Sequence, residues 1–114
     1  MKVRVVPSPE FDRRFRRLAK KYRSLPTDYL TWSDELKKNP FQGDDLGGGV
    51  RKIRMAISSK GKGKSGGARV LTLNVLVTDD AEVTLLTIYD KNEIDNVPDD
   101  YIKWLVGEAT KSQK

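Results

Sequence analysis

The chain contains no cysteine and no histidine. Without cysteine it has neither disulfides nor thiolate metal sites. Without histidine it lacks the commonest general base and the commonest metal ligand, so we expect neither a metal nor another cofactor. Any catalytic proton transfer must therefore use lysine, arginine, tyrosine or carboxylate side chains.

Segments that direct a protein to membranes are missing as well. No apolar run approaches the roughly 20 residues that a membrane-spanning helix needs, and the first ten residues include no signal-peptide core. We therefore expect a cytoplasmic protein with no membrane partner. With 37% hydrophobic and 33% charged residues, the 114 residues suit a single globular domain over positions 1–114 and not a disordered tail.

Positive charge is unevenly distributed along the chain. The net charge is +6, and seven of the 22 basic residues fall between positions 51 and 69, where there is no acidic residue. Seven more lie between positions 10 and 24, together with two acidic residues, whereas the remainder holds eight basic and fourteen acidic residues. A surface that is merely soluble intersperses the two signs. Segregated positive charge indicates a polyanionic partner, most commonly nucleic acid.

Hydrophobic periodicity predicts the element order β-αα-βββ-α. The predicted strands cover 3–6, 50–58, 68–77 and 83–91, and the predicted helices cover 8–22, about 27–38, and a segment from 98 onward. Ser8 and Pro9 start the first helix as N-cap and first helical residue. The stretches 41–49 and 59–67 are expected to be loops. The predicted fold is α+β: an antiparallel sheet with an N-terminal helical hairpin packed on one face and a C-terminal helix, the helices leaving the other face uncovered.

Basic and aromatic side chains share one side of the three later strands. Alternation along each strand places these residues together: Lys52, Arg54, Arg69, Tyr89 and Lys91. If the strands are neighbours, these side chains converge on the uncovered sheet face. An ordinary solvated sheet face is the alternative, but it would mix in acidic residues, and these strands carry only Glu82 and Asp90, near strand ends. We favour a functional site.

The loop at 59–67 invites two motif assignments that fail. Gly61, Gly63 and Gly66 match a dinucleotide fingerprint, and Gly63 to Ser65 resemble the end of a P-loop. Both motifs require a helix next, and here a strand follows. The loop is either a flexible solvated connection or a mobile cationic flap whose glycines let the backbone approach phosphates; we favour the flap.

Other basic residues are candidates for contacts with RNA. Beside the candidate catalytic residues and within the flap they are Arg51, Lys60, Lys62 and Lys64. The first helix adds Arg13, Arg17 and Lys20. Such a helical run is more often a solvated face, but a large RNA would touch both basic segments.

Three segments of the sequence resemble one known family. They are residues 51–55, 60–69 and 85–93, and they closely resemble RelE/HigB-type toxins of bacterial toxin–antitoxin modules, in particular the subgroup with a K-G-K-G-K-x-G-G-x-R loop. The upstream Leu36, Asn39, Pro40 and Gly43 also match, and the resemblance runs from about 11 to 105. Each piece is weak alone, whereas the ordered series is specific.

This resemblance implies a microbial-RNase-like fold and metal-independent cleavage of mRNA in the ribosomal A site through attack of the ribose 2′-hydroxyl. By position it implies the catalytic residues Lys52, Arg54, Arg69 and Lys91, with Tyr89 nearby. Arg54 and Arg69 would stabilise charge on the phosphate. Lys52, which other cations crowd, would act as base, and Lys91 would protonate the leaving oxygen.

The resemblance also implies a partner and leaves alternatives open. A cognate antitoxin, usually of helix-turn-helix type, would bind the toxin and alone connect it to operator DNA. In some relatives a tyrosine near the C-terminal helix assists catalysis, and Tyr101 is the only tyrosine beyond the last strand. The alternatives are a non-RNase toxin of the gyrase-inhibiting ParE type and a non-catalytic RNA-binding module.

Overall fold

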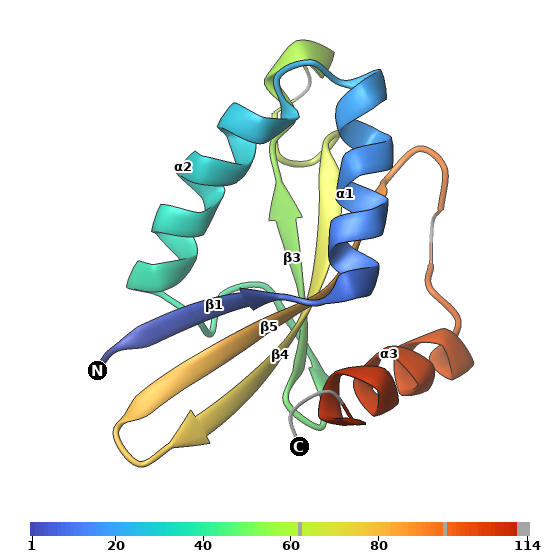
Figure 1. Cartoon of the computed structure of the whole chain (residues 1–114). Coiled ribbons are helices and arrows are strands. Elements are labelled where there is room, and N and C mark those ends of the chain that lie inside the picture. The colour runs from blue at the N-terminus through green and yellow to red at the C-terminus, as the bar shows by residue number, and fades with distance from the viewer. Residues whose placement is uncertain (62, 95, 112–114) are drawn as a thin grey trace.

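The computed structural model describes residues 1–61, 63–94 and 96–111 and has an α+β architecture (Figure 1). The elements in chain order are β1 (Val3–Pro7), α1 (Pro9–Lys21), α2 (Leu25–Lys38), β2 (Asp44–Gly47), β3 (Val50–Met55), the 3-10 turn η1 (Ser58–Lys60), β4 (Ala68–Val77), β5 (Asp80–Asp90) and α3 (Asp99–Lys111). The predicted fold class is confirmed, with one additional strand, β2. None of the helices in the described part is long and apolar enough to cross a membrane.

The five strands form one sheet in the order β1-β5-β4-β3-β2. Adjacent strands from β2 to β5 run antiparallel to one another, whereas β1 runs parallel to its neighbour, β5. The predicted antiparallel arrangement is therefore confirmed for β2 to β5 and wrong for β1. Periodicity identifies a strand but not its direction, which here follows from the long α1–α2 crossover that leaves β1 beside the last strand.

β2 lies in a segment that the sequence predicted to be a loop. Gly48 and Gly49 have φ angles of +63° and +84°. Two consecutive left-handed residues are what a two-residue hairpin turn of the I′ type needs. This turn pairs Gly47 with Val50 and joins β2 to β3. All four residues of β2 are exposed, so the strand has no hydrophobic alternation to reveal it.

Local sequence signals explain where the two N-terminal helices begin. Ser8 caps α1, since its hydroxyl oxygen accepts a 3.1 Å hydrogen bond from the Phe11 amide, as predicted. α2 begins at Leu25 instead of about 27. Pro26 lies in its first turn, where the missing N–H removes no helical hydrogen bond. Leu25 is completely buried, and it is the first residue of α2 and not the last residue of the connection between α1 and α2.

Hydrophobic cores lie on both faces of the sheet. α1 and α2 cover one face, where Leu18 and Leu36 pack in the same cluster as Val70. α3 covers part of the other face, where Leu105 packs in a cluster with Leu71. The helical hairpin on one face is confirmed, but the expectation of helices on that face alone is wrong. Because apolar side chains of β4 point to both faces, both need cover.

Candidate functional site

Three side chains form a row across the centre of the sheet. Arg54 on β3 is paired with Arg69 on β4, and Arg69 is paired with Tyr89 on β5. Directly opposed residues project from the same face, with Cβ atoms about 4.5–5.5 Å apart. Strand alternation puts this face opposite Ile53 and Val70, which pack under α1 and α2. We call Arg54, Arg69 and Tyr89 the central row.

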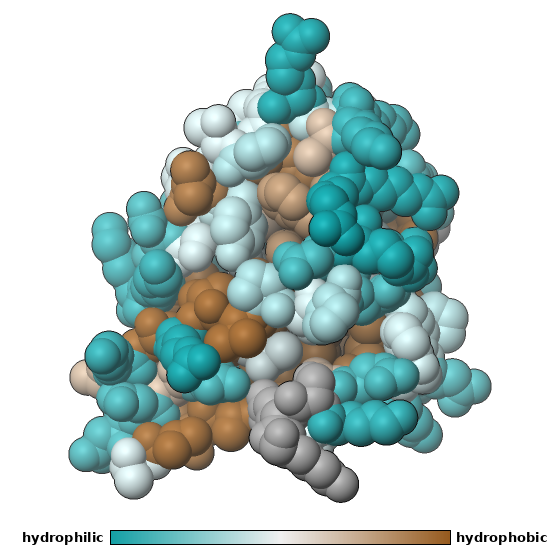
Figure 2. Space-filling model, in the orientation of Figure 1, coloured by the Kyte–Doolittle hydropathy of each residue, from teal (hydrophilic) through white to brown (hydrophobic). Residues whose placement is uncertain are grey.

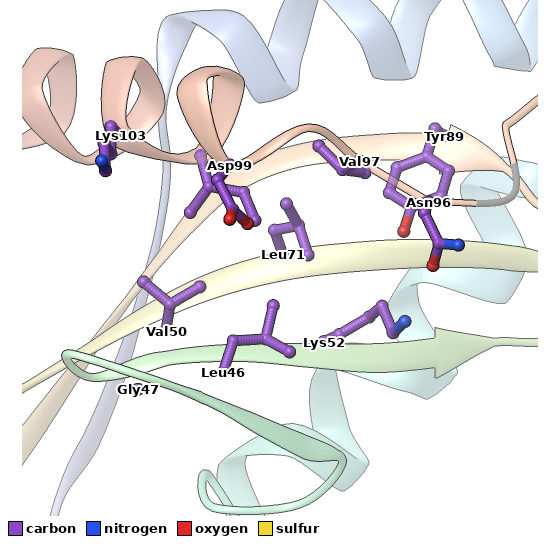
Figure 3. A pocket seen from close by; sticks show the side chains of 11 residues that line it. Leu46, Gly47, Val50, Lys52, Leu71, Tyr89, Asn96, Val97, Asp99 and Lys103 are labelled. Atoms are coloured by element: carbon purple, nitrogen blue, oxygen red, sulfur yellow. The ribbon is translucent and has the colours of Figure 1, made fainter.

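Lys52 connects the central row to two adjoining pockets. It projects from the same face as Arg54, two residues away on β3. It lines a pocket of about 360 Å³ with Asp44, Lys64 and both arginines of the row, which we call the cationic pocket. It also lines a pocket of about 420 Å³ with Tyr89 and the start of α3, which we call the mixed pocket (Figure 3). A ligand that spans both pockets must pass Lys52.

Arg69 is buried yet carries a full charge. The residue is only 8% exposed, and its guanidinium donates hydrogen bonds to the backbone oxygens of Lys64 (3.3 Å), Ser65 (3.1 Å) and Ala68 (3.2 Å). Burial, together with the neighbouring Arg54 guanidinium, lowers the pKa of Arg69 from its ordinary value. An arginine nevertheless stays protonated at neutral pH. Arg69 therefore holds the flap in place through its bonds to Lys64 and Ser65, and it also contributes positive charge to the site.

The two arginines of the central row have no close carboxylate in the part of the chain that the structure describes. Among the described residues neither Arg54 nor Arg69 forms an ion pair. Asp44 acts on Arg69 only through its longer-range charge. Two opposed guanidinium groups without a counterion favour a bound anion, and their forked donors suit a phosphate group.

Tyr89 completes the central row with a neutral hydroxyl. Burial raises the pKa of Tyr89, and the charge of Arg69 offsets part of that rise. The phenol therefore keeps its proton at neutral pH. Beside two arginines, it can donate a hydrogen bond or a proton to an oxygen that gains negative charge.

The flap is fastened at its start by a buried ion pair. Lys60 Nζ lies 2.7 Å from Asp90 Oδ1, and the Tyr22 hydroxyl donates to the other carboxylate oxygen. At the other end of the flap, Gly67 packs so closely that a Cβ atom would collide with the Met55 carbonyl oxygen. The structure therefore places Lys60 inside the protein, away from the open site where RNA contacts were predicted.

The remaining predicted catalytic residue, Lys91, stands apart from the other four. It follows the last residue of β5, is exposed, and lines neither pocket. Its backbone amide donates a 3.2 Å hydrogen bond to the Gly67 carbonyl oxygen. Strand alternation ends at Asp90, so it does not direct this side chain toward Lys52. The structure thus brings together four of the five predicted residues.

The candidate RNA-binding residues occupy different surroundings. Lys64 is exposed, lines the cationic pocket and lies 3.4 Å from Glu35. Arg51 points to the opposite face and donates to the backbone oxygens of Gln42 (3.0 Å) and Gly43 (3.1 Å). Lys62 lies outside the described residues.

The three candidates on α1 line neither the cationic pocket nor the mixed pocket. Arg13 pairs with Glu10 at 2.7 Å, and Arg17 and Lys20 are exposed. Arg17 lines a third pocket of about 290 Å³ together with Tyr89 and Asp90, so one of the three candidates reaches the edge of the central row.

Tyr101 is engaged elsewhere. Its hydroxyl donates a 2.8 Å hydrogen bond to Glu10 Oε2 and lies 3.2 Å from the Thr87 hydroxyl. Burial raises the pKa of Tyr101, and the Glu10 carboxylate raises it further. Tyr101 lines neither pocket, so its contacts join α3 to the start of α1 instead of serving the site.

Sequence reasoning missed three polar residues at the site. Asp44 lies opposite Lys52 because β2 pairs with β3, and the glycine pair at the hairpin turn was the available signal. Asn96, in the connection before α3, and Asp99, the first residue of α3, also line the mixed pocket. Neither position follows a strand alternation, so no pattern in the sequence identified them.

A family comparison agrees with this geometry. The family model described as the RelE toxin of the RelE / RelB toxin-antitoxin system matches residues 11–114. The match extends from the first turn of α1 through α3 and includes the whole central row. The family resemblance inferred from the sequence motifs is thereby confirmed. The chain belongs to the RelE family of toxins from toxin–antitoxin systems.

Proposed function

We propose that this toxin is an endoribonuclease that cleaves mRNA in the A site of the ribosome and so stops translation. The observation that carries the proposal is the central row, in which two arginines that form no ion pair with any described residue lie beside a neutral tyrosine. RelE-type toxins typically have this activity. A site of this composition suits a phosphodiester, whose cleavage builds negative charge on phosphate oxygens.

The reaction needs no group that the chain lacks. The ribose 2′-oxygen attacks phosphorus, the bond to the 5′-oxygen of the next nucleotide breaks, and the products carry a 2′,3′-cyclic phosphate and a 5′-hydroxyl. Arg54 and Arg69 bind the phosphate oxygens as charge accumulates. Tyr89 donates a proton to the leaving 5′-oxygen.

Two residues compete for the role of general base. Lys52, in its neutral form, is the base that the sequence predicted. Asp44 lies opposite it and lines the same pocket, and its carboxylate accepts a proton without first losing one. Lys64 and Lys91, at the flap and beyond β5, would bind flanking phosphates.

We further propose that the antitoxin partner is of helix-turn-helix type and docks away from the pockets. Exposed apolar side chains lie at the far end of the β4–β5 hairpin and on α2, namely Leu30, Leu76 and Val77. Figure 2 shows hydrophobic surface over β1 and this hairpin end. Val77 lies eight residues along β4 from Arg69, roughly 26 Å at about 3.3 Å per residue. Docking there would block the A site by added bulk.

The salt dependence of antitoxin binding separates this arrangement from direct covering of the basic face. Covering by acidic side chains predicts an association rate that falls steeply with ionic strength, because attraction is screened over ~10 Å at 0.1 M salt. Docking on apolar surface predicts a nearly flat response. Stopped-flow association at several salt concentrations distinguishes the two.

The activity itself is tested with ribosomes programmed with a defined mRNA. We expect cleavage within the A-site codon, mapped by primer extension, and much slower cleavage of the same mRNA without ribosomes. Intact mRNA together with gyrase inhibition would identify a ParE-type toxin. Retention of uncut mRNA would identify a non-catalytic binder.

A further inference from the structure

The mixed pocket has an apolar floor and a polar rim. Val50, Leu71 and Ile102 line it from β3, β4 and α3, and Tyr89 adds an aromatic ring. In Figure 3 Asn96 lies on the segment before α3 and Asp99 at the start of that helix, both over the strands, and Lys52 lies toward the Tyr89 end of the pocket. A planar ligand with one polar edge matches this combination.

The polar groups of the rim are available to a ligand. Among the described residues, no hydrogen bond or ion pair engages the Asp99 carboxylate, the Asn96 amide or the Lys103 ammonium group. Asp99 and Lys103 are four residues apart on α3, so they lie on the same side of the helix. One acceptor and one cationic donor therefore border the pocket from a single helix.

The position of the mixed pocket relates it to the phosphate site. Lys52 lines both pockets, and Tyr89 belongs to the central row as well as to the mixed pocket. A phosphate held by Arg54 and Arg69 would leave the attached nucleoside beside Lys52. Proteins that recognise single-stranded RNA hold bases in this way, against aromatic and apolar side chains with polar groups on the Watson–Crick edge.

We propose that the mixed pocket is a nucleobase subsite that prefers guanine. Guanine presents two adjacent donors, the N1–H and the N2 amino group, to which a carboxylate such as Asp99 binds through both oxygens. Its O6 accepts from a cation such as Lys103. Uracil offers a single donor, adenine has no ring N–H on that edge, and cytosine lacks one too. The proposal rests on the proposed function, because it assigns a base to the same RNA.

A purely structural role for Asp99 is the competing explanation. Asp99 and Asp100 both lie in the first turn of α3, where acidic side chains stabilise the positive end of the helix. Asp100 does not line the pocket. Asp100→Asn is therefore a matched control for Asp99→Asn, since both remove one negative charge from the same helical turn.

Binding is measured on the folded toxin by NMR titration with 3′-GMP, 3′-AMP, 3′-CMP and 3′-UMP. We expect 3′-GMP to bind roughly tenfold more tightly than the others, which is the discrimination typical of one bidentate contact to a base. Asp99→Asn should reduce this preference to less than about twofold, and Asp100→Asn should keep it. Equal binding of the four nucleotides, or an unchanged preference in Asp99→Asn, would overturn the proposal.

Cleavage on ribosomes separates this proposal from the proposed function. A guanine preference in binding that depends on Asp99, with no mRNA cleavage, would refute the nuclease and leave the subsite standing. Cleavage whose base preference is the same in wild type and Asp99→Asn would refute the subsite and leave the nuclease standing.

Discussion

Lys60 and Asp90 form an ion pair of 2.7 Å between side chains that are only 7% and 1% exposed. The pair joins the start of the flap to the last residue of β5. The Tyr22 ring, 5.3 Å from the Lys60 ammonium group, brings the end of α1 into the same cluster. Three segments that border the site are thus held by one buried carboxylate.

Removing one partner of this pair should destabilise the fold strongly. Asp90→Asn or Lys60→Met leaves the other charge buried without a partner, which typically costs about 3–5 kcal/mol. Urea denaturation measures this loss. The double variant should recover part of it, because no buried charge remains. A loss below about 1 kcal/mol in both single variants would contradict the assignment.

The same carboxylate predicts how stability depends on pH. Burial alone would raise the pKa of Asp90, but hydrogen bonds from Lys60, Tyr22 and the Asn92 amide outweigh it and hold the pKa below its ordinary value. A depressed folded pKa gives stability that is complete above the unfolded pKa, about 3.9, and is lost as pH falls through the folded value. Wild type should therefore lose stability below about pH 4. Asp90→Asn, compared at each pH, should lose less over that range.

Substitution of Arg54 and substitution of Arg69 should affect stability differently, although the two residues are paired across β3 and β4. Arg54→Ala should reduce cleavage by roughly two to three orders of magnitude, as loss of a transition-state donor typically does, without lowering stability. Arg54 is exposed, and no described hydrogen bond involves its guanidinium. Arg69→Ala should lose cleavage and also stability, because three backbone oxygens lose their donor. If a folded Arg54→Ala protein kept full cleavage activity, Arg54 would have no role in the mechanism.

The identity of the general base can be read from matched substitutions at Asp44 and Lys52. If Asp44 accepts the proton, Asp44→Asn should lower the single-turnover cleavage rate by roughly 10²–10⁴-fold, and Lys52→Met should lower it much less. If Lys52 does so, Lys52→Met should cause the larger loss, and Asp44→Asn should keep most of the rate. Asp45→Asn, a neighbouring carboxylate on β2, provides the control.

Alternation and capping made much of this fold predictable. The apolar residues of β3 and β4 gave their strands and faces, and Ser8 and Pro9 gave the start of α1. These signals are local, so they do not report how strands pair. The parallel pairing of β1 with β5, and the docking of α3 on the second face, depend on contacts between distant segments.

The site, like the fold, was predictable only where a local pattern in the sequence applied. Strand alternation identified Lys52 and the central row correctly as one face. It failed for Lys91, which lies just past the last residue of β5. Lys60 was predicted from the composition of the flap, which could not show its ion pair with Asp90, 30 positions away. Asp44 could be found only by recognising the hairpin turn that the glycine pair forms, and Asp99 only by knowing where α3 docks on the sheet. Neither residue belongs to a hydrophobic alternation that would have identified it.

The central claim, cleavage by attack of the 2′-hydroxyl at the central row, is tested most directly by a single deoxy substitution. Once the cleaved bond is mapped on programmed ribosomes, the nucleotide on its 5′ side is replaced by its 2′-deoxy form in an otherwise identical mRNA. We predict that cleavage at that bond is abolished, and that the unsubstituted mRNA yields a 2′,3′-cyclic phosphate and a 5′-hydroxyl. Continued cleavage of the deoxy-substituted mRNA at the same bond would contradict this account.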